Sequence, residues 1–294
     1  GGADTAPVVK LSEGKNLLEL WHGPTCAFKD MALQMLPHLL TASLRKTGET
    51  RTACILVATS GDTGKAALDG FHDVPGTKIM VYYPVDGVSP MQKLQMATQE
   101  GANVEVIAIH GNFDDAQSAV KRIFTDDETR AQLDRDGMML SSANSINWGR
   151  LAPQIAYYVS AYCDMVKAGT IRQGDKINVC VPTGNFGNIL AAYIAKQMGL
   201  PVNKFICASN RNNVLTDFFK KDGEYNRNRD FYTTTSPSMD ILISSNLERL
   251  LFFASDFDDR MVAELMAKLN GEGSYKVASD VFAKIAADFD AGCC

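Results

Sequence analysis

Lys29 is the residue whose type and surroundings most directly suggest chemistry. It lies in the stretch LELWHGPTCAFKDMAL, residues 18–33, where Gly23 and Pro24 indicate a turn. We expect Asp30 to N-cap a buried apolar helix over residues 31–40, which would place Lys29 at the mouth of that helix. Burial disfavours the charged form of a lysine, and the neutral amine is the nucleophile that forms a Schiff base. The alternative is an ordinary lysine whose charged end reaches solvent beside a helix cap.

Two glycine-rich segments separate apolar runs from helical patterns. Residues 59–64 read TSGDTG and residues 182–188 read PTGNFGN. In such a loop, free backbone N–H groups at a helix N-terminus can hold an anion. A plain strand-to-helix turn uses the same residue types for conformational reasons, so each loop alone leaves both interpretations open.

A third segment, SSANSINWGR at residues 141–150, also suits a phosphate. Arg150 offers a planar guanidinium that can donate two hydrogen bonds at once. The alternative is a polar crossing between domains with Arg150 in a surface ion pair. A phosphorylated cofactor bound through an amine would need all of these features together: a lysine at a buried helix mouth, two loops suited to anions, and this segment. Pyridoxal phosphate meets that description.

Alternating apolar runs and helical patterns predict the elements that position these residues. Expected strands span residues 53–58, 78–83, 104–109, 138–141, 176–181 and 205–208. Expected helices after the first span residues 65–71, 90–98, 114–124, 151–166, 189–198, 214–220, 239–253, 260–269 and 278–289. This alternation is typical of an α/β fold with a parallel sheet and helices on both faces. Residues 221–236 are polar and rich in turn residues, which indicates an exposed loop.

Length and composition limit the domain organisation and the partners. A chain of 294 residues predicts two domains. We expect a smaller α/β domain over residues 46–149 and a larger, discontinuous cofactor domain formed by residues 1–45 and 150–294. The net charge of −5 argues against nucleic acid or an anionic membrane as a partner. No apolar run reaches membrane-spanning length and no secretory signal is recognisable, so we expect a cytoplasmic protein.

Cysteine spacing and missing fingerprints exclude further classes. The seven cysteines are scattered, and Cys54, Cys180 and Cys207 lie in apolar runs, which predicts buried free thiols. With no CxxC pair or Cys/His cluster, we expect no metal site. The absence of GxGxxG argues against a nicotinamide-dependent oxidoreductase.

Five motifs in order resemble the bacterial and fungal threonine synthase family. They are LELWHGPTCAFKD, TSGDTG, ANSINWGR, PTGNFGN and SPSMDILISSNLERLL, and they span about residues 18–251. That family belongs to the fold-type-II pyridoxal-phosphate enzymes. The resemblance therefore implies a helix-flanked, parallel-sheet, two-domain fold of the tryptophan-synthase-β-like architecture.

The resemblance also implies roles for individual residues. Lys29 would hold the cofactor as a Schiff base, and Asp62 occupies the place where related enzymes put an Asn facing the pyridine hydroxyl. The implied ligands of the cofactor phosphate are Gly184, Asn185, Phe186, Gly187 and Asn188. The implied substrate-binding residues are Thr59, Ser60, Thr63, Asn144, Asn147 and Arg150, with Arg150 the best candidate for the substrate phosphate.

The reaction implied is a carbon–oxygen lyase reaction that converts O-phosphohomoserine and water to threonine and phosphate. Alternatives are a threonine-synthase-like phospholyase, a dehydratase-like elimination, or a catalytically incompetent fragment. The chain begins with Gly1 and Gly2, and it lacks the family's N-terminal segment and the Pro-His-containing motif near the family's C-terminus. We therefore expect a chain shortened at both ends. The choice between monomer and homodimer stays open.

Overall fold

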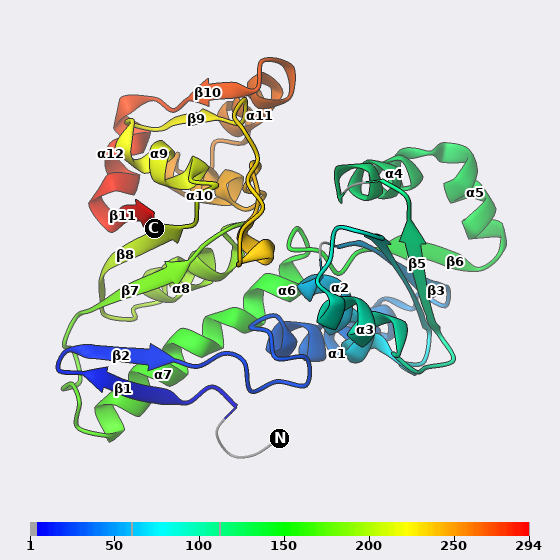
Figure 1. Ribbon diagram of the computed structural model, residues 1–294, viewed down its shortest axis with the longest axis horizontal. Helices are drawn as coiled ribbons and strands as arrows, with labels where there is room; N and C mark the ends of the chain where they lie inside the picture. The colour runs from blue at the N-terminus through cyan, green and yellow to red at the C-terminus, as the bar shows by residue number, and fades with distance from the viewer. Residues whose placement is uncertain (1–4, 60, 112, 294) are drawn as a thin grey trace. The chain divides into compact units, whose positions relative to one another are not determined.

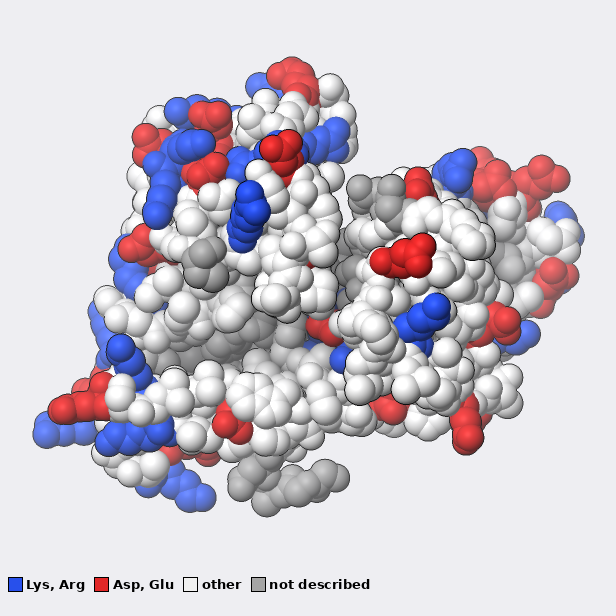
Figure 2. Space-filling view, viewed as in Figure 1, with Lys and Arg blue, Asp and Glu red and all other residues white. Residues whose placement is uncertain are grey.

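A computed structural model describes residues 5–59, 61–111 and 113–293 (Figure 1). The chain forms two compact units, Gly1–Asp164 and Met165–Cys294, called here the N-terminal unit and the C-terminal unit. The expected domain division at residues 45/46 and 149/150 stays a prediction. Acidic and basic side chains are interspersed over the face seen in Figure 2, in keeping with the small net charge.

The N-terminal unit is built on a four-stranded parallel sheet with the strand order β5-β4-β3-β6. The strands are β3 (Thr52–Ala58), β4 (Thr77–Pro84), β5 (Val104–Ile109) and β6 (Met138–Ser141). Every residue of β3 after Thr52 is buried. A continuous apolar run of this kind is expected for an inner strand covered on both faces.

Alternate residues of β3 face different helices. Ala53, Ile55 and Val57 share a core with Leu33 of α1 (Asp30–Thr47) and with residues of α2 (Asp62–Phe71). Cys54, Leu56 and Ala58 pack instead with Ala116 and Val120 of α4 (Phe113–Thr125). Because strand side chains alternate between faces, this split shows that helices cover both faces of the sheet. The predicted α/β fold with a helix-flanked parallel sheet is confirmed.

The remaining elements of the N-terminal unit precede, connect or follow these strands in the sequence. The hairpin of β1 (Val8–Ser12) and β2 (Lys15–Leu18) precedes α1, and α3 (Pro90–Ala97) and α5 (Asp127–Arg135) lie between strands in sequence. The helix expected over residues 151–166 is interrupted. It consists of α6 (Trp148–Leu151), a 3₁₀ turn η1 (Ala152–Gln154) and α7 (Ile155–Lys167). Pro153 in the turn has no N–H to donate to a continuous helix.

The C-terminal unit contains a three-stranded parallel sheet with the order β11-β8-β7. Its strands are β7 (Ile177–Pro182), β8 (Val202–Ser209) and β11 (Phe289–Cys293), and a small antiparallel pair joins β9 (Glu224–Asn226) to β10 (Ser274–Lys276). Its helices are α8 (Gly187–Gln197), α9 (Val214–Lys220), η2 (Pro237–Met239), α10 (Leu247–Ala254), α11 (Asp259–Gly271) and α12 (Ser279–Asp288).

Four expectations differ from the observed C-terminal unit. The predicted helix over residues 239–253 is wrong in its first half, because regular helix begins only at Leu247. The predicted loop over residues 221–236 contains β9, and the predicted helix over residues 278–289 ends at Asp288, after which Phe289 begins β11. Cys180, expected to be buried, is exposed, because alternate side chains of β7 point away from the core.

Gly70 makes the close crossing of α2 and α1 possible. Pro37 inside α1 has no N–H, so it cannot donate the usual helical hydrogen bond to the Leu33 carbonyl. Gly70 packs against that carbonyl, and a Cβ on residue 70 would collide with the carbonyl oxygen. The start of α1, which follows Lys29, is therefore seated directly on α2, which begins with Asp62.

We predict that Gly70→Ala destabilises the protein, although Ala is the better helix former. Overpacking against backbone is expected to lower the free energy of unfolding by about 1–3 kcal/mol, measured by urea denaturation. The control is Gly271→Ala at the end of α11, where the added Cβ would meet nothing within 4 Å. That variant should be neutral or more stable by up to about 1 kcal/mol. Equal effects at both positions would contradict the close crossing.

Candidate active site

Lys29 is the last residue before α1, and only 8% of its surface is exposed. The preceding loop is held in place by two sets of contacts. The Phe28 carbonyl accepts a 2.6 Å hydrogen bond from the Tyr157 hydroxyl. The carboxylate of Asp30 accepts hydrogen bonds from the N–H groups of Thr25 and Ala27, at 3.0 and 3.2 Å.

Asp30 thus has a different role from the one expected. It is the first residue of α1 rather than its N-cap, and no side-chain cap is present at this helix start. Its carboxylate folds back on the loop before the helix. Gly23 makes this possible, because a Cβ there would collide with the Asp30 side chain. The result is a tight loop that presents Lys29 at the helix mouth.

The Lys29 amine faces the carboxylate of Asp62, the first residue of α2. The distance from Lys29 Nζ to Asp62 Oδ2 is 3.3 Å. Burial lowers the pKa of Lys29 from 10.5 to about 8, while Asp62 acts in the opposite direction and the charges of Arg150 and Lys65 lower it further. A lysine with this pKa has a much larger neutral fraction near pH 7 than a surface lysine.

Two residues that sequence reasoning missed also bind Asp62. Lys65 Nζ lies 3.5 Å from Asp62 Oδ1 and donates to the Thr25 carbonyl at 2.8 Å. Gln92 Nε2 donates to Asp62 Oδ1 at 2.8 Å, while its Oε1 accepts from the Ser89 N–H in a capping box at the start of α3. The signal for Lys65 was its position one helical turn after Asp62. The position of Gln92 near the start of a predicted helix gave no indication that it binds Asp62.

The TSGDTG loop is organised by its own first hydroxyl. Thr59 Oγ1 accepts hydrogen bonds from the N–H groups of Gly61 and Gly64, at 2.9 and 3.0 Å, and Thr59 is buried. Gly61 has φ 138°, a conformation that glycine readily adopts. Ser60, predicted to bind substrate, lies outside the described residues. The loop therefore fixes where α2 begins and where Asp62 points.

Arg150 lies in the same unit and is 5% exposed. Its Nη1 donates to the Ala143 carbonyl at 2.9 Å, and its Nη2 donates to Thr63 Oγ1 at 3.3 Å. Burial lowers the pKa of Arg150 to about 10, and Asp62 opposes that shift. The structure thus brings together Lys29, Asp62, Thr63 and Arg150 from three separate segments.

Two further predicted residues shape the segment before Arg150. Asn147 caps α6 by accepting from the Gly149 N–H at 2.9 Å, and it donates to the Ser142 carbonyl at 2.8 Å. Asn144 donates to the Ala58 carbonyl at the end of β3, at 3.3 Å. Asn144 therefore ties this segment to the end of β3, from which the TSGDTG loop starts, while Asn147 holds the segment together internally.

The site has a positive electrostatic character. Lys29, Lys65 and Arg150 are each less than 9% exposed, and their charges surround the single carboxylate of Asp62. Buried charges of one sign in excess favour a ligand of the opposite sign. The arrangement suits an anionic substrate next to a nucleophilic amine.

The PTGNFGN loop lies between β7 and α8 in the C-terminal unit (Figure 1). Phe186 precedes α8 in the left-handed conformation with φ 62°, and Gly187 begins the helix. A Cβ on Gly184 would lie 3.2 Å from the Met239 Cα, so a side chain there would press on the neighbouring backbone. Left-handed residues at a helix N-terminus arrange successive N–H groups into an anion-binding concavity, which fits a phosphate.

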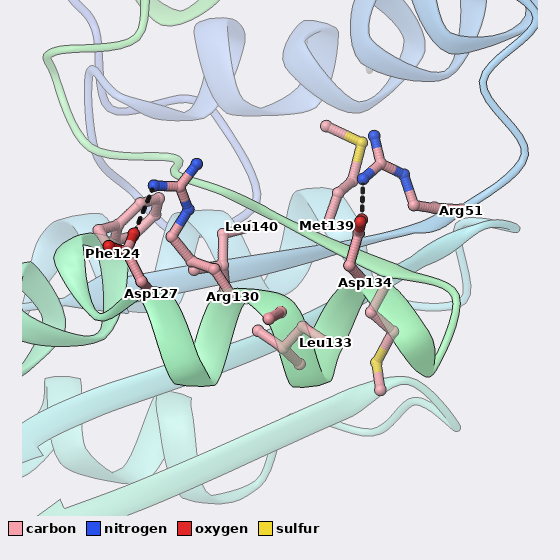
Figure 3. A pocket seen from close by; sticks show the side chains of 10 residues that line it. Arg51, Phe124, Asp127, Arg130, Leu133, Asp134, Met139 and Leu140 are labelled. Carbon is pink, nitrogen blue, oxygen red and sulfur yellow. Dashed lines mark hydrogen bonds and ion pairs between the residues drawn. The ribbon is translucent and has the colours of Figure 1, made fainter.

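A separate cavity in the N-terminal unit holds none of the predicted site residues. Its volume is about 670 Å³, and Figure 3 shows α5 and β6 contributing side chains to it. Arg130 pairs with Asp127 at 3.6 Å, and Arg51 pairs with Asp134, so the basic groups of this cavity already face carboxylates.

The described residues form neither a metal-binding cluster nor a membrane-spanning helix. Among them, His, Cys, Asp and Glu side chains form no group of three or more suited to a metal ion. No helix in the described ranges combines the length and apolar character that crossing a bilayer requires.

The chain is similar in sequence to pyridoxal-phosphate dependent enzymes and to threonine synthases. A family model described as pyridoxal-phosphate dependent enzyme matches residues 10–270. Threonine synthase-like 1 of Homo sapiens is 46% identical over 98% of this chain and 39% of its own length. Threonine synthase of Pseudomonas aeruginosa is 43% identical over 92% of this chain and 55% of its own length.

A solved structure extends the comparison to three dimensions. Threonine synthase from Brucella melitensis with bound pyridoxal phosphate superposes with a TM-score of 0.87 and 41% identity, covering 98% of this chain and 59% of that one. The chain spans only about two fifths to three fifths of the length of these three relatives.

We predict that Asp62→Asn lowers the pKa of Lys29 below its value of about 8. The Asp62 charge and its hydrogen bond both raise that pKa, so removing the charge increases the neutral fraction of the amine at a given pH. The measurement is the rate of acylation of Lys29 in cofactor-free protein over a pH series, read by peptide mass spectrometry.

The matched control is Asp69→Asn, two turns further along α2, where the carboxylate binds Gln34 rather than Lys29. It should leave the labelling profile of Lys29 unchanged. If Asp62→Asn shifted the midpoint upward, or left it in place, the proposed pairing of Lys29 with Asp62 would be wrong.

Proposed function

We propose, since the chain belongs to the pyridoxal-phosphate dependent enzyme family, that it converts O-phosphohomoserine and water to threonine and phosphate with pyridoxal phosphate as cofactor. The observation that carries the proposal is the buried Lys29 amine, 3.3 Å from Asp62 and beside the buried Arg150. Similarity to threonine synthases supports the choice of reaction.

Lys29 and the loop at residues 184–188 are the proposed cofactor ligands. Lys29 supplies the covalent attachment, because its amine is buried and its pKa is about 8. The loop supplies backbone N–H groups for the cofactor phosphate, through Gly184, Asn185, Phe186, Gly187 and Asn188. When bound, pyridoxal phosphate acts as an electron sink that makes protons next to the substrate amine removable.

Lys29 is also the proposed general base and acid. An amine with a pKa near the working pH can accept a proton and return it, and proton transfer of this kind is most effective when the two values match. Asp62 holds the amine in place and, through Gln92, is itself held to α3. Lys65 shares the Asp62 carboxylate, which limits how strongly Asp62 can keep Lys29 charged.

Arg150 is the proposed ligand of the substrate phosphate. Its guanidinium is fixed by the Ala143 carbonyl, so little side-chain freedom is lost when an anion binds. Thr63 is hydrogen-bonded to the guanidinium. The proposed substrate-binding set is completed by Thr59, Ser60, Asn144 and Asn147. An anionic small molecule is the proposed partner and the cytoplasm the proposed location.

Elimination without addition of water is the second candidate. It is favoured by the 46% identity to threonine synthase-like 1 of Homo sapiens, whose name states likeness to a synthase rather than synthase activity. Such an enzyme would release phosphate, and the remaining enamine would be hydrolysed after release to 2-oxobutyrate and ammonia, so that no threonine forms. Product analysis on O-phosphohomoserine separates the two reactions.

We predict that the protein reconstituted with pyridoxal phosphate absorbs visible light and releases threonine and phosphate in equal amounts from O-phosphohomoserine. Borohydride should bleach the absorbance and attach the cofactor to the peptide that contains Lys29, as read by intact and peptide mass. Lys29→Ala should stay colourless and gain no mass. Lys93→Ala, an exposed lysine on α3, is the control and should behave like the unsubstituted protein.

The outcomes separate the alternatives. Phosphate release accompanied by 2-oxobutyrate would replace the synthase with the eliminating enzyme. Protein that remains colourless with added cofactor would indicate a catalytically incompetent fragment.

For Arg150 we predict a loss of kcat/KM on O-phosphohomoserine by about 10- to 100-fold in Arg150→Ala, the effect of losing hydrogen bonds from a charged donor. Cofactor absorbance should be retained, because Arg150 is assigned to the substrate. Arg150→Lys should recover part of the loss by restoring the charge without the planar fork. A variant with normal kcat/KM would remove Arg150 from the substrate site.

A further inference from the structure

Residues 244–246, part of the SPSMDILISSNLERLL motif, donate hydrogen bonds to carbonyl groups of the PTGNFGN loop. Ser244 Oγ donates to the Gly184 carbonyl at 2.7 Å. Asn246 donates twice to the Asn185 carbonyl, from Nδ2 at 2.9 Å and from its backbone N–H at 3.1 Å. Ser244 is 6% exposed and Asn246 is fully buried. Two successive peptide groups of the loop are therefore held by their carbonyl oxygens.

Holding the carbonyls determines where the N–H groups point. A trans peptide group is planar, and its N–H points opposite to its carbonyl. The described chain contains no cis peptide bond. The N–H groups of Asn185 and Phe186 are therefore directed away from residues 244–246, toward the concave side formed by the left-handed Phe186 and the start of α8.

These N–H groups are available to a ligand. Within the described part of the chain, Asn185, Phe186 and Gly187 donate no hydrogen bond to another backbone carbonyl. Phe186 is 1% exposed, and a buried N–H without a partner is rare in proteins. The geometry thus leaves a row of donors on the side opposite to Ser244 and Asn246.

The supporting segment is itself fixed by buried groups. Asn246 Oδ1 accepts a hydrogen bond from Arg249, which orients the amide so that its NH₂ group faces the Asn185 carbonyl. The Ser244 N–H donates to the Tyr225 hydroxyl at 2.8 Å, and that hydroxyl donates to the Leu242 carbonyl at 2.9 Å. Helix α10 begins directly after this segment, at Leu247.

We propose that Asn246 and Ser244 are positioning residues that orient the peptide N–H groups of Asn185 and Phe186 toward the phosphate of pyridoxal phosphate. They act through the carbonyls of Gly184 and Asn185 and do not touch the cofactor. This inference rests on the proposed function and deepens it, because it names the part of the C-terminal unit that recognises a phosphorylated cofactor.

The test compares two ligands that differ only in the phosphate. Cofactor-free protein is titrated with pyridoxal 5′-phosphate and with pyridoxal, and binding is followed by absorbance. In Asn246→Ala the affinity for pyridoxal 5′-phosphate should fall by about tenfold or more, the effect of one lost buried hydrogen bond. The affinity for pyridoxal should stay unchanged, because that ligand has no phosphate to place.

A second variant guards against misfolding. Ser244→Ala removes the donor to the Gly184 carbonyl and should show the same selective loss. The control is Asn203→Ala, where an exposed asparagine amide donates to the Asn178 side chain at 2.9 Å. It should bind both ligands as the unsubstituted protein does. Far-ultraviolet circular dichroism and thermal unfolding identify a variant that has lost its fold.

The failures of the two proposals can be distinguished. Equal losses for both ligands in folded variants, or no loss for either, would overturn the positioning role while the proposed reaction stands. If the unsubstituted protein bound neither ligand, the proposed function and this inference would both be overturned.

Discussion

The burial of Lys29 opposite Asp62 is the constraint on which the N-terminal unit depends. A buried lysine is destabilising when charged, and its burial lowers the pKa to about 8. The single carboxylate of Asp62 stabilises the charged form, and Lys65 and Arg150 counteract it. Carbonyl groups of Thr25 and Ala143 hold these two cations in place. The site thus balances the amine between its two protonation states.

The fold supports this balance with unusually close packing. Pro37 leaves the Leu33 carbonyl without its helical donor, and Gly70 lets α2 approach that carbonyl. The helix that begins with Asp62 and the helix that follows Lys29 are therefore in direct backbone contact. This crossing joins the helix that follows Lys29 to the helix that carries Asp62.

The two glycine-rich loops are held in different ways. In TSGDTG the hydroxyl of Thr59 binds the loop's own N–H groups, so this loop orders charged side chains. In PTGNFGN the carbonyls are bound by Ser244 and Asn246, which leaves backbone N–H groups as donors. Similar residue types thus give one loop that positions charged side chains and one whose backbone N–H groups are suited to bind an anion. The residue types alone would not have separated these roles, because the difference lies in which side chain packs behind each loop.

Periodicity and short motifs determined much of this protein from sequence alone. The strands of the N-terminal sheet, the helices α8, α9 and α11, the α/β class and the family are local or ordered features, and they were predicted correctly. Residues 240–246 and β11 were not. Their conformations depend on distant partners, such as Gly184, which lies 60 positions from Ser244, and β8, with which β11 pairs. A helical spacing of apolar residues in the sequence gives no information about a distant carbonyl that accepts hydrogen bonds from the same groups.

Tertiary structure alone decided the electrostatics of the site. Asp62 lies 33 positions after Lys29, and Gln92 lies 30 positions after Asp62. The sequence indicated that Lys29 and Asp62 matter, but not that they face each other, nor that Lys65 and Gln92 share the carboxylate. The pKa of a lysine follows from its burial and from the charges within a few ångströms. Those quantities exist only once helices α1, α2 and α3 have packed against one sheet.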